Sequence, residues 1–208
     1  MNARQKRRLF TIIVLVLVLA FYLYRQRVHL GLPANPISCG IQCGVERWSV
    51  KTLSDSGAAQ VNFSPRPSTV AWLTTQPAPP SLPPDSRIAP LEFQAFTVRA
   101  HLIGYKQETD RDYHLLLADI GDPSATMIAE IPSSECSGAC SSQYANSFEA
   151  ARREVEARFG MPTGSFQTPP GDVIVDVTGV AFFDFFHRQR GVAPNAIELH
   201  PVLTLRFE

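Results

Sequence analysis

The sequence lacks the short motifs that mark the common catalytic and nucleotide-binding sites. It has no glycine-rich phosphate loop, no Gly-x-Ser-x-Gly nucleophile elbow, no His-Glu-x-x-His pair and no internal repeat. These absences remove the sequence evidence for a nucleotide-binding enzyme, an α/β-hydrolase, a zinc peptidase or a solenoid. A Ser-His-Asp set can be assembled from almost any chain of this size, so it carries no weight. We therefore expect a protein that is not an enzyme.

The chain also lacks an excess of positive charge, since 19 basic residues balance 19 acidic ones. Six of the basic residues flank the first apolar run, namely Arg4, Lys6, Arg7, Arg8, Arg25 and Arg27. The remainder carries 13 basic against 19 acidic side chains, a formal charge of −6. Proteins that bind polyanions gain most of their affinity by displacing counterions with Lys and Arg. This balance argues against nucleic acid as a partner.

The segment from Leu9 to Tyr24, LFTIIVLVLVLAFYLY, contains no charged residue. As a helix it would span roughly 24 Å, somewhat less than a hydrocarbon core of about 30 Å, and Arg8 and Arg25 can snorkel at its ends. We predict that residues 1–27 form a single-pass membrane anchor with a transmembrane helix. More basic residues precede the run than follow it, which places the N-terminus in the cytoplasm. The alternative is a cleaved signal peptide and a secreted domain, although no small-x-small cleavage site follows.

The four cysteines occur as two short pairs, Cys39-x3-Cys43 and Cys136-x3-Cys140. An even number of cysteines beyond a membrane, in an oxidising compartment, favours disulfides. Two pairs with short spacers also match a four-thiolate zinc site. Bridges across the pairs would close a loop of about 100 residues and stabilise more than two local loops would. The spacing does not decide the pairing.

The rest of the chain divides by composition. Residues 28–45 are rich in Gly, Pro and Cys and are predicted to form a stalk, followed by an extracytoplasmic domain over residues 46–208. Residues 64–90 are proline-dense and cannot hold a regular helix or a central strand throughout. We expect them to wrap the domain, with one helical turn around residues 69–73. The barrel proper is assigned to residues 91–208.

From residue 91 the pattern becomes that of a small β-barrel. Period-two alternation and turn residues predict three strands, then a helix, then two long strands between Val173 and Phe207. The expected ranges are 96–102, 113–119 and 126–131 for the strands and 146–159 for the helix. This order is that of the OB-fold. The predicted fold is mainly β, an OB-like five-stranded Greek-key barrel with one helix, preceded by the transmembrane helix and the Pro-rich wrap.

The last strand carries the densest polar pattern. Alternation sets Glu198 and His200 side by side on one face, together with Val202 and Thr204, while Ile197 and Leu199 face the core. Two further histidines lie on or beside neighbouring strands, and the candidate ligand or metal site is His114, His187, Glu198 and His200. The alternative is that these groups only hold loops in place. We assign no metal and no cofactor.

An aromatic run ends the preceding strand and forms a candidate stacking surface. Its members are Phe182 and Phe186, beside Arg188 and Arg190. Exposed rings next to guanidinium groups could stack on bases or sugars. The alternative is that Phe182 and Phe186 lie buried under the Pro-rich wrap.

Five segments together resemble a known group of proteins. They are ERWSVKTLSD (46–55), VNFSPRPSTV (61–70), EFQAFTVRAHLIGYKQETDRDYHLLLAD (92–119), TMIAEIP (126–132) and GVAFFDFFHRQRGVAPNAIELHPVL (179–203). The chain is similar in these segments to a family of uncharacterised bacterial exported or membrane-anchored proteins. The resemblance implies an extracytoplasmic single domain and no particular activity.

Together these observations predict a membrane-anchored binding or interaction module. The expected ligand is a saccharide or a cell-envelope protein. The alternative is a metal-dependent hydrolase or nuclease that uses His114, Glu198 and His200. Convergence of these side chains in the fold would favour the alternative.

Overall fold

The computed structural model of the 208-residue chain describes Gln5, residues 39–187 and residues 189–208. Apart from Gln5, the predicted anchor, residues 1–27, lies outside this part, as does most of the predicted stalk, residues 28–45. Within it, no helix is both long and apolar enough to cross a membrane. One compact unit extends from Cys39 to Glu208 and therefore includes the first Cys pair, which we had assigned to the stalk.

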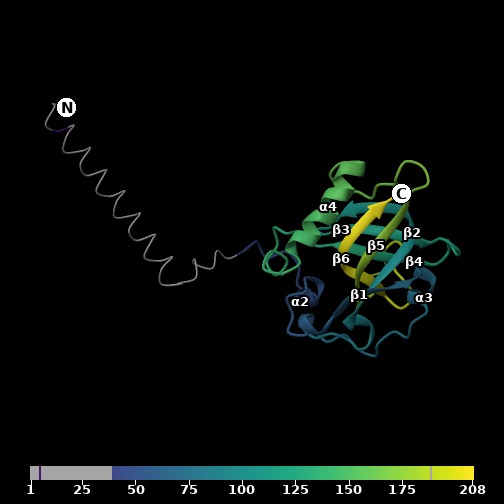
Figure 1. Ribbon diagram of the computed structural model, residues 1–208, viewed down its shortest axis with the longest axis horizontal. Coiled ribbons are helices and arrows are strands. Elements are labelled where there is room, and N and C mark those ends of the chain that lie inside the picture. Colours follow the sequence, from purple (N-terminus) through teal and green to yellow (C-terminus); the bar gives the residue numbers. More distant parts are fainter. Residues whose placement is uncertain (1–4, 6–38, 188) are drawn as a thin grey trace. The chain divides into compact units, whose positions relative to one another are not determined.

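Five strands form a closed barrel. Figure 1 shows these strands, β2 to β6, gathered in one body. Their order is β2-β3-β4-β6-β5, and β5 pairs back onto β2 to complete the closure. All neighbouring strands are antiparallel except β4 and β6, which run parallel. The strand bounds are Gln94–Gln107 for β2, Tyr113–Asp119 for β3, Thr126–Ile131 for β4, Ile174–Phe183 for β5 and Ile197–Phe207 for β6. The prediction of a mainly β barrel is confirmed.

Shorter elements surround the barrel. Strand β1 (Asn62–Ser68) pairs in parallel with the first half of β2 and extends the sheet by one edge strand. The sequence did not predict β1 because it contains Pro65 and Pro67, and proline is compatible with a strand only at an edge. The helices are α2 (Trp48–Lys51), α3 (Val70–Thr74) and α4 (Ala145–Phe159), with 3-10 turns at Ala58–Gln60 and Leu91–Phe93. Figure 1 shows α4 near the upper part of the barrel and α2 and α3 near the lower part.

Helix α4 packs on the barrel through one apolar stripe. Phe148, Ala151 and Val155 follow each other at three- and four-residue spacing, and all three are buried in the main core. Full burial of a ring such as Phe148 contributes about 1.5–3 kcal/mol. The helix ends at Gly160, whose φ of 78° is readily adopted only without a Cβ.

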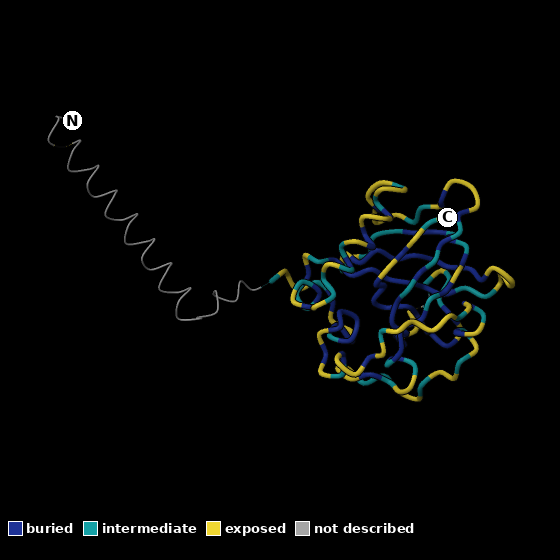
Figure 2. Tube along the Cα trace, viewed as in Figure 1, coloured by how far each residue is buried: buried dark blue, intermediate teal, exposed yellow. Residues whose placement is uncertain are grey.

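The barrel interior takes every second side chain of each strand, and Figure 2 shows the resulting concentration of buried positions along the strands. Val98 and Ala100 of β2, Leu115 of β3, Ala129 of β4 and Leu199 of β6 belong to this apolar core. Their sequence neighbours must therefore point outward from the barrel wall. This alternation decides where the polar side chains of the last strand lie.

Val202 departs from the predicted alternation of β6, whereas Leu203 and Leu205 lie in the core as predicted. Val202 was expected on the polar face with Thr204; Thr204 is exposed as expected, but Val202 is buried in the core. The reason is a register shift against β5, where Gly179 pairs with Val202 while Ala181 pairs with Leu199. A Cβ at Gly179 would lie 2.9 Å from the carbonyl oxygen of Pro201, so the close approach requires glycine.

Asp119, at the end of β3, joins the barrel to α3. Its carboxylate accepts hydrogen bonds from the backbone amides of Ala71 at 2.8 Å, Gly121 at 2.8 Å and Asp122 at 3.1 Å. Burial alone would raise the pKa of this carboxyl group, but the three amides hold it below its usual value.

Replacement of Asp119 by alanine should therefore lower the free energy of unfolding at pH 7 by about 1–3 kcal/mol, because three amide donors lose their acceptor. A depressed pKa contributes stability that is present above the unfolded value near 3.9 and is lost as the pH falls through the folded value. Urea titrations of the wild type and the variant at pH 7 and pH 3 measure this. The difference in the free energy of unfolding between the two proteins should be smaller at pH 3 than at pH 7. An equal difference at both pH values would contradict the lowered pKa of Asp119.

Candidate functional site

A row of polar side chains crosses the outer wall of the barrel. Lys106 of β2 pairs with His114 of β3, and His114 pairs with Glu130 of β4. His200 of β6 lies beside Glu130, with its Nδ1 3.1 Å from Oε2 of that carboxylate. Glu198 stands on the same face of β6, two residues earlier. Four neighbouring strands thus bring together groups that are far apart in the sequence.

This outer face is not open to solvent. His200 is 0% exposed, His114 1% and Glu198 2%. Part of the cover comes from α2, whose Lys51 donates a hydrogen bond of 2.8 Å to Asp184 just after β5. The rest includes the loop between β5 and β6, whose backbone at residue 191 packs directly against the side chain at residue 116 of β3. We call the covering segments, residues 46–55, 184–187 and 189–196, the cap.

Glu130 is the centre of the contacts beneath the cap. Its Oε1 lies 3.0 Å from Nδ1 of His114, while its Oε2 faces His200. Asp112 approaches the other ring nitrogen of His200, with Oδ2 3.3 Å from Nε2, and Glu198 Oε2 lies 3.9 Å from Nδ1. One carboxylate therefore contacts two imidazoles, and one imidazole contacts three carboxyl groups.

The environment shifts the protonation of the central groups. Burial alone would raise the pKa of Glu130, but His114 and His200 hold it well below its usual value. Burial alone would lower the pKa of each histidine. The adjacent carboxylates more than offset this and raise both pKa values to about 9, through Glu108 and Glu130 for His114 and through Asp112 and Glu130 for His200.

The remaining carboxyl groups are shifted the other way. Burial, followed by the charges of Glu130 and Asp184, raises the pKa of Glu198 to about 8. Burial raises the pKa of Asp112 to about 6. Buried carboxyl groups that share a site cannot all ionise without compensating positive charge. The raised pKa values of His114 and His200, together with Lys51, place such positive charge beside these carboxyl groups.

Several buried atoms of the cluster lack a hydrogen bond. Among the described residues, Asp112 Oδ2, Glu198 Oε2 and both ring nitrogens of His200 have no hydrogen-bond partner. The carboxylates around His200 are within ion-pair distance, but the directions required for hydrogen bonds are not met. Unsatisfied buried polar atoms are rare in folded proteins and call for a ligand or a functional role.

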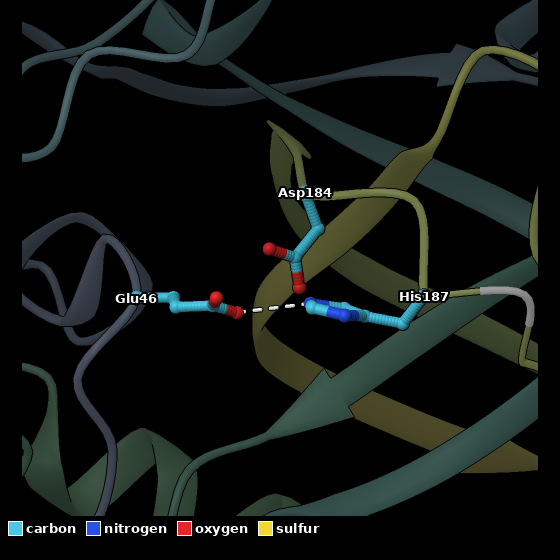
Figure 3. A group of neighbouring side chains, drawn as sticks. All are labelled: Glu46, Asp184 and His187. Atoms are coloured by element: carbon cyan, nitrogen blue, oxygen red, sulfur yellow. Dashed lines mark hydrogen bonds and ion pairs between the residues drawn. The ribbon is translucent and has the colours of Figure 1, made fainter.

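His187, the fourth predicted member, does not join this cluster. Figure 3 shows its ring facing Glu46, with Asp184 beside them. The distance from His187 Nε2 to Glu46 Oε2 is 2.9 Å, and both side chains are more than two-fifths exposed. The structure thus brings together three of the four predicted residues, His114, Glu198 and His200, and places His187 in a separate surface group.

The predicted stacking residues are also divided. Phe182 is fully buried beneath the guanidinium of Arg47, 4.7 Å from the ring centroid, and in this arrangement it cannot stack on a ligand. Phe186 is 58% exposed. Arg190 lies over the ring of Phe166 at 4.8 Å. Arg188 is outside the described residues.

A separate groove lies between the Pro-rich wrap and the first half of β2. Its volume is about 570 Å³, and Trp72, Phe96, Pro77 and Pro90 are among the residues that line it. Trp72 is 47% exposed, and the centroid of its ring lies 6.0 Å from that of Phe96. Arg66 is the charged side chain of the lining. The groove is therefore mainly apolar, with one cation at its margin.

Sequence reasoning missed two central residues of the buried cluster. Glu130 is the only charged residue of its strand, TMIAEI, and pairing the hairpin of β3 and β4 would have set it opposite His114. Lys51 gave no comparable signal, because it comes from the segment 46–55 and reaches the cluster only through tertiary packing.

The fold and its contacts define a disulfide-containing β-barrel protein with a capped polar cluster on the barrel wall. No protein-family model, no curated protein and no solved structure matches the chain. The similarity of its segments to uncharacterised exported proteins therefore stays a prediction.

Proposed function

We propose that this protein is an extracytoplasmic binding module, anchored by residues 1–27, that binds a saccharide through the groove at Trp72. The observation that carries the proposal is a half-exposed indole ring in a mainly apolar groove of about 570 Å³. Ligand sites are typically concave and apolar, with a few polar groups that fix orientation. An indole face is a suitable platform for the apolar face of a sugar ring, and Arg66 favours a saccharide that carries a carboxylate.

Two features support the compartment and the OB-like nature of the barrel. Disulfides Cys39–Cys140 and Cys43–Cys136 are typical of proteins in oxidising spaces outside the cytoplasm. The helix α4 lies between the third and fourth strands of the barrel, the position expected from the predicted OB-like order.

The cap explains why the groove, rather than the barrel face, is the proposed site. In OB-folds the face of strands two and three takes the ligand. The corresponding outer face of β3 and β4 carries His114 and Glu130, and the cap covers it. Among the residues that the structure describes, none covers Trp72 in this way, and Trp72 is 47% exposed in the groove beside β1 and β2.

Replacing Trp72 with alanine should weaken saccharide binding at least tenfold, because aromatic anchors carry much of the affinity of a binding site. The measurement is a glycan array with neutral and acidic saccharides, including peptidoglycan fragments, followed by calorimetry on the full chain. Phe186→Ala is the matched control, since that ring is exposed but does not line the groove. If no saccharide binds the wild type, or if Phe186→Ala removes binding while Trp72→Ala does not, the proposal is wrong.

A metal-dependent hydrolase or nuclease is the second candidate. The convergence of His114, Glu198 and His200 around Glu130 is the observation that favours it. A hydrolytic centre must also admit water and substrate. The near-complete burial of these three residues argues against catalysis in this conformation.

A further inference from the structure

A second depression, separate from the groove at Trp72, lies against helix α4. Its volume is about 640 Å³, within the range of small-molecule sites. The turn after β2, the segment after β4 and the helix α4 form its walls, and none of its lining residues also lines the groove. The lining is mainly polar. Its charged members are Glu108, Arg111, Glu135, Glu149, Arg152 and Glu156.

One of these residues, Arg152, is a buried cation without a counter-ion. The described part of the chain buries four arginine or lysine side chains, namely Arg47, Lys51, Arg87 and Arg152. Each of the first three forms an ion pair with a buried carboxylate. Arg152 is only 8% exposed, yet no carboxylate of the described residues lies within ion-pair distance of it. Buried charges are rarely left unpaired, so this guanidinium calls for an anion.

The contacts of Arg152 hold its guanidinium in place without neutralising it. The guanidinium carbon lies 3.5 Å from the centroid of the Tyr113 ring. Nη1 donates to the backbone carbonyl oxygens of Arg111 at 3.0 Å and Ile131 at 3.3 Å. All of these partners are uncharged groups. The side chain also lines the depression, where an anionic group of a ligand can reach it.

The same depression contains one carboxylate without a cationic partner. Three of its four carboxylates form ion pairs, namely Glu108 with Lys106, Glu135 with Arg111 and Glu149 with Arg153. The fourth, Glu156, has no such pair among the described residues and accepts a hydrogen bond of 2.6 Å from the hydroxyl of Tyr113. Burial, followed by this hydrogen bond, raises the pKa of Tyr113 to about 12, so the phenol stays protonated and donates.

The unpaired cation and the unpaired anion are neighbours. Arg152 and Glu156 are four residues apart on α4 and therefore lie on the same side of the helix, one turn from each other. Both contact Tyr113, Arg152 over the ring and Glu156 at the hydroxyl, and this arrangement keeps them from pairing with each other. The depression thus presents a free positive charge beside a free negative one.

We propose that this depression binds a small zwitterion, a free amino acid or a short peptide, whose carboxylate pairs with Arg152 and whose ammonium pairs with Glu156. A guanidinium suits a carboxylate because it can donate two parallel hydrogen bonds. A ligand with a carboxylate alone would leave Glu156 unpaired, and one with an ammonium alone would leave Arg152 unpaired. Met161, 70% exposed in the lining, offers an apolar surface to the side chain of the ligand.

The test is calorimetry on the full chain with its disulfides intact, at pH 7, with each common L-amino acid and with L-alanyl-L-alanine as probes. At least one probe should bind with a Kd below about 10 mM. The N-acetyl and amide analogues of that probe lack one charge each and should bind at least tenfold more weakly. Tighter binding of the dipeptide than of every amino acid assigns the peptide as the ligand, and the reverse assigns the free amino acid. If no probe binds, or if either analogue binds as tightly as the zwitterion, the proposal is wrong.

Variants locate the bound zwitterion. Glu156→Gln keeps an acceptor for Tyr113 but loses the charge, so the zwitterion and its N-acetyl analogue should bind this variant with similar affinity. Arg152→Gln should do the same for the zwitterion and its amide analogue. Because Glu156 is only half-buried, its variant tests the site even if Arg152→Gln fails to fold.

The matched controls are Glu154→Gln and Arg158→Gln, which remove exposed charges of the same helix that do not line the depression. Both should bind the zwitterion as the wild type does. An equal loss of affinity in the controls, or unchanged discrimination between the zwitterion and its N-acetyl analogue in Glu156→Gln, would refute the site. Trp72→Ala should also leave this binding unchanged, so the result is independent of the saccharide assay.

Discussion

Replacing Glu92 with leucine should lower the free energy of unfolding by about 3–5 kcal/mol, because it leaves the guanidinium of Arg47 buried without its partner. The pair is bidentate, with Nη1 to Oε1 at 2.6 Å and Nη2 to Oε2 at 2.8 Å. Both side chains are 0% exposed.

The pair also holds three segments together. Arg47 donates to the carbonyl oxygens of Ser86 in the wrap and Phe183 at the end of β5, and Glu92 accepts from the amides of Ile88 and Phe183. Loss of the carboxylate therefore leaves a buried cation without its counter-ion and two amide donors without an acceptor. The cost should exceed that of an ordinary hydrogen bond, about 1 kcal/mol.

Two controls distinguish the effect of burying the ion pair from the effect of losing a charge on the free energy of unfolding. Arg99→Ala breaks an exposed pair with Glu208, whose side chains are 54% and 45% exposed, and should cost less than about 1 kcal/mol. The double variant Arg47→Met with Glu92→Leu removes both charges and should be more stable than Glu92→Leu alone. Chemical denaturation measures all four proteins. If Glu92→Leu were no more costly than Arg99→Ala, the buried pair would not stabilise the fold as argued.

The sequence was most informative where neighbouring residues determine structure. The bounds expected for β3 and β4, residues 113–119 and 126–131, agree with the structure, because short apolar runs between polar turns leave few alternatives. The helical turn expected near residues 69–73 is α3, which the side chain of Thr69 caps through the amide of Trp72.

The sequence was least informative where distant segments meet. Alternation correctly set Glu198 and His200 on one face, but it could not show that residues 46–55 would bury that face. A single polar residue such as Lys51 has no periodic pattern that reveals its partner 133 residues later in the chain. The clustering of His114 with Glu130 required strand register, and the separation of His187 required the path of a loop.

The two disulfides are nested in the sequence, and we expect their contributions to the free energy of unfolding to be non-additive for this reason. All four cysteines are paired, so disulfides are confirmed, and the bridges cross between the two Cys pairs. Cys43–Cys136 spans 93 residues and lies inside Cys39–Cys140, which spans 101. While either bridge remains, removing the other opens only a small ring of roughly eight residues. On the chain-entropy argument each single loss costs about 2.5 kcal/mol.

Loss of both bridges should cost about 7 kcal/mol, because the long loop is then released as well. This exceeds the sum of the two single effects and is comparable to the whole stability of many domains. Serine variants of each pair and of both pairs, unfolded in urea, test the prediction, and a double effect equal to or below the sum would contradict the nested-loop argument. Residue 43 lies just before Arg47 and Lys51, so residues 47–52 should be the first to gain hydrogen exchange in the double variant. Simultaneous exchange of the cap and the barrel strands would instead show that the buried pair and the cluster hold the cap without the bridges.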